Sequence, residues 1–159
     1  MPLRSQLLKA VQTAEGSIFT IKKTITSSDI TTSAQALTSV ANGGELLIEQ
    51  IIVKTDATGL AGGTNFVIAT DNAKGTVNNF VETVANLGAN ITLVLSGGAI
   101  QAETTTSDAH PTVTSCPTVL EAGKKLTFNN TGSVGTGAGT IDVYVTFRRL
   151  SAGVTIRPA

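Results

Sequence analysis

The sequence is poor in the residue types from which most active sites and binding platforms are built. Its 159 residues include one cysteine, one histidine, one tyrosine and no tryptophan, and only 14% are charged. A single cysteine, Cys116, rules out an internal disulfide, so the fold does not depend on an oxidising compartment. The scarcity of aromatic residues argues against a sugar-binding platform and against base stacking on single-stranded nucleic acid.

The balance of charge gives no global pull toward a polyanion. Formal net charge is zero, which predicts no nucleic-acid partner and no attraction to an anionic membrane. Cations do gather at the two ends, for example Arg4 and Lys9 against Glu15. We interpret them as solvated charges, with contact to an acidic partner as the alternative. The uncharged stretch 83–102 is too rich in Asn and Gly to span a membrane. The start of the chain lacks the apolar core of a signal peptide, so we expect synthesis in a cytosol.

What is abundant points to β structure. The sequence holds 26 threonines and 16 glycines, and hydrophobic residues make up 41%. Threonine favours strands and glycine favours turns. A chain of this length is most simply one domain, burying roughly 70% of the surface of its unfolded state. We therefore predict a single domain over residues 17–159, preceded by an N-terminal arm at 1–16.

Alternation of apolar and polar residues predicts the strands. They are expected at 17–27, 36–40, 45–55, 65–71, 90–96, 99–106, 119–128 and 140–150. The run 45–55 is almost continuously apolar, so we expect it to be buried on both faces. Short strands punctuated by Gly and Asn predict an all-β fold, either an antiparallel β-sandwich or a jelly roll.

Two segments carry helical spacing instead. One short helix is predicted at about 76–87, where five apolar residues recur every three or four positions before Gly88. The other is a short helix within the arm, at 4–15, which would be marginal alone and would gain stability by packing on something larger. The arm is our candidate partner-binding segment, through Arg4, Leu7, Leu8, Lys9 and Val11.

The glycine-rich stretch GSVGTGAG, residues 132–139, raises the possibility of a phosphate-binding loop. Such a loop needs a strand before it and a helix after it, so that backbone N–H groups and the helix dipole meet the anion. Here a strand follows, and the sequence has no Gly-Lys-Ser/Thr. The stretch is therefore predicted to be a hairpin loop joining the last two strands.

Other residues that could carry chemistry lack the partners they would need. His110 and Cys116 could form a nucleophile pair, but no third group to orient the histidine is evident. Zinc would need two further ligands at suitable spacing. Glu45 and Glu49 could serve as an acid and a base, but two solvated strand carboxylates are the simpler interpretation. We predict no enzyme activity, cofactor, metal or small-molecule substrate.

Two stretches of the sequence resemble proteins of tailed-phage particles. The segment 43–63, GGELLIEQIIVKTDATGLAGG, is similar to the long inner strand and following loop of jelly-roll virion proteins. The segment 120–149, with EAGKKLTF, a glycine-rich loop and GTIDVYVTFRR, resembles the final hairpin of the same group. These patterns of glycine and alternating residues contain no catalytic motif, so no functional residue can be transferred individually.

The resemblance implies a capsid decoration (cement) protein. Such a protein is a small β-sandwich, usually a homotrimer, that binds the major capsid protein through loops and a terminal arm. Its location would be the capsid surface of a virion, after synthesis in the host cytoplasm. A tail, fibre or head-completion protein is the nearest alternative. A carbohydrate-binding or adhesin module, and last a small hydrolase, come from different classes.

Overall fold

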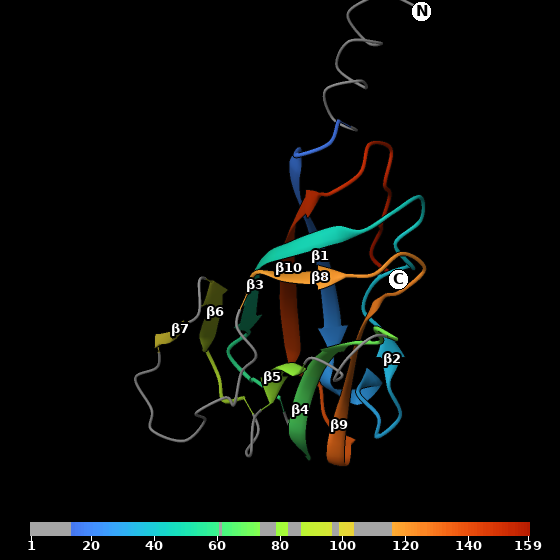
Figure 1. Ribbon diagram of the computed structural model, residues 1–159. Helices are drawn as coiled ribbons and strands as arrows, with labels where there is room; N and C mark the ends of the chain where they lie inside the picture. The colour runs from blue at the N-terminus through green and yellow to red at the C-terminus, as the bar shows by residue number, and fades with distance from the viewer. Residues whose placement is uncertain (1–13, 61, 74–78, 83–86, 97–98, 104–115) are drawn as a thin grey trace, which may run out of the picture.

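The computed structural model describes all of the chain except residues 1–13, 61, 74–78, 83–86, 97–98 and 104–115 (Figure 1). Its regular secondary structure is almost entirely β-strand, with one short 3-10 helix, η1, in the described part. The elements are β1 (Ile18–Thr26), η1 (Ser27–Asp29), β2 (Gln35–Ala36), β3 (Leu46–Thr55), β4 (Gly62–Thr70), β5 (Asn79–Glu82), β6 (Thr92–Ser96), β7 (Ala99–Glu103), β8 (Thr118–Leu120), β9 (Leu126–Gly135) and β10 (Thr140–Arg149).

The order of the strands is that of a jelly roll. The six-stranded sheet runs β1-β10-β3-β6-β7 with β8 also beside β3, and the four-stranded sheet runs β2-β9-β4-β5. Antiparallel pairs join β1 with β10, β2 with β9, β3 with β6, and β4 with β5. A long antiparallel ribbon wound into two facing sheets gives this set of pairs, with β7 and β8 as additions. The predicted antiparallel sandwich is confirmed in its jelly-roll form.

Apolar side chains from both sheets fill the space between them. Along β1 and β10 the burial alternates residue by residue, as their sequence pattern predicts. The rings of Phe19 and Phe147 stack at a centroid distance of 5.6 Å. The largest fully buried side chains include Ile48, Ile51, Leu93 and Phe147 from one sheet and Phe66 and Ile68 from the other.

Strand β3 is buried on one face only, so the prediction of two buried faces is wrong. Its pairing with β10 shifts register between Thr146 and Phe147, which leaves Glu49 as an extra residue. A β-bulge of this kind bends a strand, and Figure 1 shows β3 turning sharply along its length. The extra residue resets the alternation, so that apolar residues before and after it face the same side. The inward side chains are Leu46, Ile48, Ile51 and Val53.

The helix predicted over 76–87 is also wrong where the structure describes this segment. Residues Asn79–Glu82 form strand β5, which pairs antiparallel with β4, and Leu87 is fully buried. The other residues of the predicted helix lie outside the described part, except at its end. Val, Phe, Thr and Asn are mediocre helix formers, so the local preference for a helix is small. Pairing with β4 satisfies backbone groups that its edge would otherwise leave open.

The glycine-rich stretch joins the two sheets, so the predicted hairpin loop is wrong. Strand β9 continues to Gly135, and residues 136–139 cross from the four-stranded sheet to β10 in the six-stranded sheet. Two glycines are needed because other backbone passes close by. A Cβ on Gly135 would overlap the carbonyl oxygen of Ser27, and one on Gly139 would overlap that of Gly59. A strand–loop–strand pattern has the same appearance in sequence whether the strands pair or belong to facing sheets.

The single strand predicted over 119–128 is two strands. Strand β8 pairs with β3, β9 pairs with β4 and β2, and the turn at 121–125 crosses between the sheets. Gly123 adopts a φ of +75°, which glycine reaches without steric cost, and its amide donates to the carbonyl of Ala41 at 2.8 Å. The remaining predicted strands correspond to β1, β4, β6, β7 and β10.

The C-terminal residues pack along the segment that follows β2. Val154 and Ile156 are buried, and bridges join Thr38 to Pro158 and Asn42 to Thr155. The strand predicted at 36–40 is therefore shorter in the structure, where β2 ends at Ala36 and single bridges at Thr38 and Asn42 follow it. Within the described residues, no helix has the length and apolar character to cross a membrane.

Candidate functional site

The predicted partner-binding residues Arg4, Leu7, Leu8, Lys9 and Val11 all lie outside the described residues. The structure does describe where the arm joins the domain. The amide of Gly16 donates to the carbonyl of Arg149 at 2.8 Å, and the amide of Arg149 donates to the carbonyl of Ser17 at 3.0 Å. The Arg149 guanidinium also lies 4.0 Å from the ring centre of Phe19. Residue 16 is therefore held firmly at the end of the β1–β10 pair.

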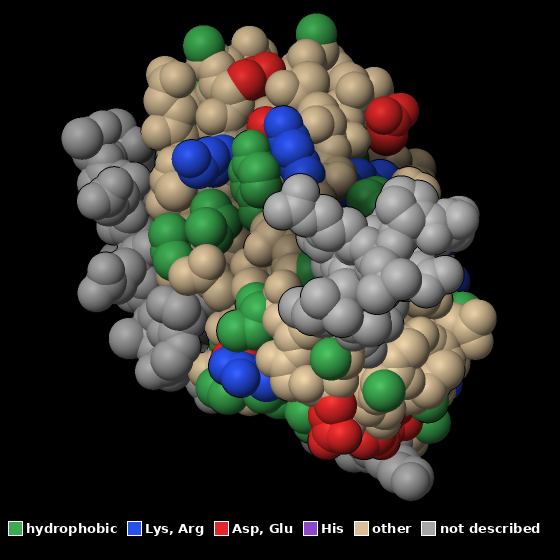
Figure 2. Space-filling model, turned by 90° about the horizontal axis from the view of Figure 1, so that it is seen from above, with side chains coloured by type: hydrophobic (Ala, Val, Ile, Leu, Met, Phe, Trp, Pro, Cys, Tyr) green, Lys and Arg blue, Asp and Glu red, His purple; other side chains and the backbone are tan. Residues whose placement is uncertain are grey.

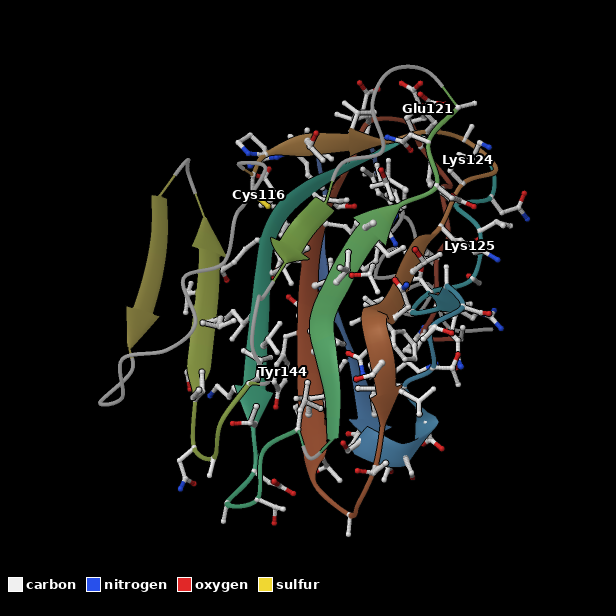
Figure 3. All side chains as sticks on the ribbon, turned by 90° about the horizontal axis from the view of Figure 1, so that it is seen from below. Cys116, Glu121, Lys124, Lys125 and Tyr144 are labelled. Atoms are coloured by element: carbon white, nitrogen blue, oxygen red, sulfur yellow. The ribbon has the colours of Figure 1, made fainter. Side chains whose placement is uncertain are left out.

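Cys116 has the surroundings of a structural thiol. Only 2% of its surface is exposed, and it lies beside β3 (Figure 3). Burial, together with the charge of Glu49, raises the pKa of the Cys116 thiol to about 11. The thiol is protonated at neutral pH, whereas a nucleophilic cysteine needs the thiolate. His110, its proposed partner, lies outside the described residues.

Glu45 and Glu49 do not form a matched pair of solvated carboxylates. Glu45 is exposed just before β3, and its carbonyl accepts a hydrogen bond from the amide of Leu150. Glu49 is half-buried at the bulge, where its carboxylate accepts from the Arg148 guanidinium in an ion pair. Among the described residues, no cluster of three His, Cys, Asp or Glu side chains could hold a metal ion.

The side of the six-stranded sheet that faces away from the core carries a regular array of side chains, which we call the outer face. Cross-strand pairing places these residues in four rows across β1, β10 and β3, and three of the rows continue onto β8 or β6. All of them are exposed or half-buried. The rows are Ile18, Arg148, Leu47 and Val119; Thr20, Thr146 and Gln50; Lys22, Tyr144, Ile52 and Val94; and Thr24, Asp142, Lys54 and Thr92.

Tyr144 lies at the centre of the outer face between two lysines. The ammonium groups of Lys22 and Lys54 lie 5.4 and 6.0 Å from its ring centre. Lys22 also forms an ion pair of 2.7 Å with Asp142, and the hydroxyl of Thr24 donates to Asp142 at 2.6 Å. Burial alone would raise the pKa of Asp142, but these two hydrogen bonds, together with the charge of Lys22 and a contact with Tyr144, lower it.

A shallow hollow of about 330 Å³ opens on the outer face. Thr20 and Thr146 line one part of it, and their hydroxyls share a hydrogen bond of 2.9 Å. Gln50, Ile52, Lys54 and Tyr144 complete the lining. Apolar surface, amide and hydroxyl groups and one cation therefore meet in a single open depression.

The end of the molecule where β1 begins and β10 ends has the same mixed character. Figure 2, which looks onto this end, shows hydrophobic side chains interleaved with lysine and arginine side chains across its centre. Ile18 and Val119, at the two sides of the first row, are 55% and 36% exposed. Such a surface resembles the core and rim of a protein interface more than a site for chemistry.

A second hollow, of about 480 Å³, lies beside β1, η1 and β2. Its lining is mainly polar and includes Lys23, Asp29 and Gln35, with the ring of Phe128 among the lining groups. The Lys23 ammonium donates to the carbonyl oxygens of Ala36 at 3.0 Å and Ala159 at 2.7 Å, so it fastens two segments together. Phe128 is only 2% exposed and offers little surface for stacking.

The outer-face hollow has no signal in the sequence. The alternation in β10 does place Tyr144 and Thr146 on the outward side. The outward direction of Ile52 and Lys54 could not be predicted, because it depends on the bulge at Glu49, which the apolar run 45–55 does not reveal. The register between three strands, which no local pattern specifies, brings these residues together.

The class defined by these observations is a two-sheet jelly roll with a packed apolar interior. No protein-family model and no curated protein matches the chain. Two solved structures share similarity over 91% of the chain, "Structure of infectious bursal disease virus Gx strain" and "Structure of infectious bursal disease virus Gt strain". The identities are 12% and 15%, with TM-scores of 0.20 and 0.17. This chain spans 36% and 38% of their respective lengths. Similarity this low carries no functional inference.

Proposed function

We propose that the protein is a virion structural protein, and specifically a decoration (cement) protein that binds and stabilises a phage head. The observation that carries this proposal is the strand order, because jelly rolls of this kind build viral capsid proteins, lectins and cupins. A fold alone does not define a function. The surface and the interior of the molecule therefore have to distinguish a capsid protein from a lectin or a cupin.

The interior favours an assembly role. Phe66, Phe147 and Ile68 are almost completely buried, so side chains of the protein itself fill this part of the space between the two sheets. A jelly roll that acts on a small molecule needs a cavity between or beside its sheets. The hollow beside β1 and β2 is mainly polar, whereas the outer face combines apolar, polar and charged groups on an open surface, which suits contact with a large partner.

The proposed partners are the major capsid protein and further copies of this chain. A homotrimer follows from the resemblance of segments 43–63 and 120–149 to decoration proteins. If the apolar run 45–55 had two buried faces, it would also need cover from another subunit, but the outward residues of β3, Leu47, Ile52 and Lys54, form a mixed face and give the trimer no further support. Binding by several copies on a symmetric shell can raise the overall affinity by about 10²–10⁴-fold over one contact.

Heads of the phage that encodes this chain, prepared from a strain with the gene disrupted, provide the direct test. We expect the purified protein to co-sediment with these heads, to saturate at a fixed number of copies per shell, and to raise the temperature at which the heads rupture. Association with isolated tails but not with heads would favour the tail or fibre alternative. Binding to neither particle would overturn a virion role.

One observation favours a second candidate, a carbohydrate-binding module. The hollow beside β1 and β2 presents Asp29, Gln35 and Thr31, whose side chains could hydrogen-bond sugar hydroxyls. Against it, the hollow lacks the exposed aromatic platform that commonly binds a sugar ring. A glycan array probed with the wild type and with variants at Asp29 and Gln35 separates the two functions. A carbohydrate-binding module should give a signal that these variants lose, and a decoration protein should give none.

A further inference from the structure

The outer face carries one positive charge that the described residues do not balance. The one acid among its described residues, Asp142, is engaged by Lys22, and Glu49 at the neighbouring bulge pairs with Arg148. Lys54 lies directly opposite Asp142 in the strand register, yet no ion pair joins them in the described structure. Both carboxylate oxygens of Asp142 accept hydrogen bonds from β1, one from Thr24 and one from Lys22.

The free charge lies at a place suited to an incoming group. Lys54 is exposed and lines the hollow, with its ammonium 6.0 Å from the centre of the Tyr144 ring. Tyr144 and Ile52 present half-buried apolar surface beside it, and the Gln50 amide can both donate and accept hydrogen bonds. A carboxylate on a short aliphatic stem complements this arrangement, with its charge near Lys54 and its stem on Ile52 and Tyr144.

We propose that the outer-face hollow docks an acidic loop of a protein partner, with an Asp or Glu side chain seated beside Lys54. The inference rests on the virion role proposed above, in which that partner is the major capsid protein. Complementary charge at an interface speeds association and selects the partner more than it adds affinity. The hollow is open to solvent, so the contact should also weaken as salt screens it.

Charge reversal at Lys54 tests the proposal on the full chain, with heads lacking this protein as the probe. We expect Lys54→Glu to weaken head binding by at least about tenfold and the neutral Lys54→Gln by about threefold. Raising NaCl from about 50 to 500 mM should weaken the wild type clearly and Lys54→Glu little. Unchanged thermal unfolding would show that both variants fold.

The matched control is Lys124→Glu, which makes the same change of charge on the turn at 121–125. Figure 3 shows Lys124 far from Tyr144, and its hydrogen bonds in the described structure, to Glu121 and Ala41, involve only its main chain. Equal binding by Lys54→Glu and Lys124→Glu, while the wild type binds heads, would overturn the docking site and leave the virion role standing. Failure of the wild type to bind heads would overturn both. A change of oligomeric state in Lys54→Glu, with head binding retained, would identify a second copy as the occupant and also overturn the proposal.

Discussion

The two faces of the six-stranded sheet are built from the same strands and have opposite characters. The inward residues of β10, such as Val143, Val145 and Phe147, are at most 1% exposed. Their outward neighbours, such as Tyr144 and Thr146, are half-buried and make cation–π or hydroxyl contacts. Because successive side chains of a strand point to opposite faces, the residues that build the core alternate with those that form the proposed docking surface. Changes to one face should therefore leave the property of the other largely intact.

The largest expected effect comes from breaking the inner face. Phe147→Ala removes a fully buried ring that stacks on Phe19, and we expect a loss of about 3–5 kcal/mol in the free energy of unfolding. The adjacent Thr146→Ala removes one exposed hydroxyl contact with Thr20 and should cost less than about 1 kcal/mol. Denaturant unfolding of both variants measures the difference. Similar losses at the two positions would contradict the assignment of the faces.

Two of the connections between the sheets, β3–β4 and β9–β10, meet at one carboxylate, that of Asp56. One of its oxygens accepts from the amides of Thr58 and Gly59, both at 2.8 Å. The other accepts from the amide and the hydroxyl of Thr140, at 2.8 and 3.0 Å. These bonds favour the ionised form and lower the pKa of Asp56 from 3.8 to about 2.

An intermediate effect is expected from pH. Because the folded-state pKa of Asp56 lies below its unfolded value of 3.8, its contribution to stability is complete above about pH 4 and is lost as pH falls toward 2. Asp56→Asn should lower the melting temperature at pH 7. The gap between variant and wild type should then narrow between pH 4 and pH 2. Melting curves across this range check the prediction, and a gap that stays constant with pH would contradict it.

How far the sequence predicted the fold depended on whether each strand keeps its alternation. In β1 and β10 it is unbroken, and the inward and outward residues follow directly from the sequence pattern. In β3 one inserted residue, Glu49, changes the parity, and only pairing with β10 reveals it. Segment 79–82 shows the same limit, since its helical spacing is overridden by the free edge of β4.

The candidate site was less predictable than the fold. The arm could be proposed from sequence because amphipathic spacing is local. The hollow could not, because Lys54 and Thr20 are brought onto one surface by the order of β1, β10 and β3. Likewise, the glycines at 135 and 139 indicate a tight passage, but the backbone that approaches them comes from Ser27 and Gly59. Long-range pairing decides these features.

The smallest effect on stability is expected at the arm, outside both faces. The described contacts at the root of the arm begin at Gly16, whose amide is bonded to Arg149, apart from one turn bond from Ser17 to Ala14. Ala14 and Glu15 are exposed. Deleting residues 1–15 should therefore shift the melting temperature by less than about 2 °C. If the melting temperature drops sharply while head binding is retained, the segment belongs to the domain's own core and the arm hypothesis is wrong.

The same deletion should sharply weaken head binding if the arm packs its apolar side on the capsid. Leu7, Leu8 and Val11 share a side at helical spacing. Burying one such side chain contributes about 1.5–3 kcal/mol, of which ordering the arm consumes a part. We therefore expect Leu8→Asp alone to weaken binding at least about tenfold, which corresponds to about 1.4 kcal/mol. Gln6→Asp, which adds the same charge two residues earlier, is the matched control. Binding is measured by co-sedimentation with heads. Equal weakening by the two variants would show that charge rather than apolar contact governs the arm, and wild-type binding by both would show that the arm does not contact the head through Leu8.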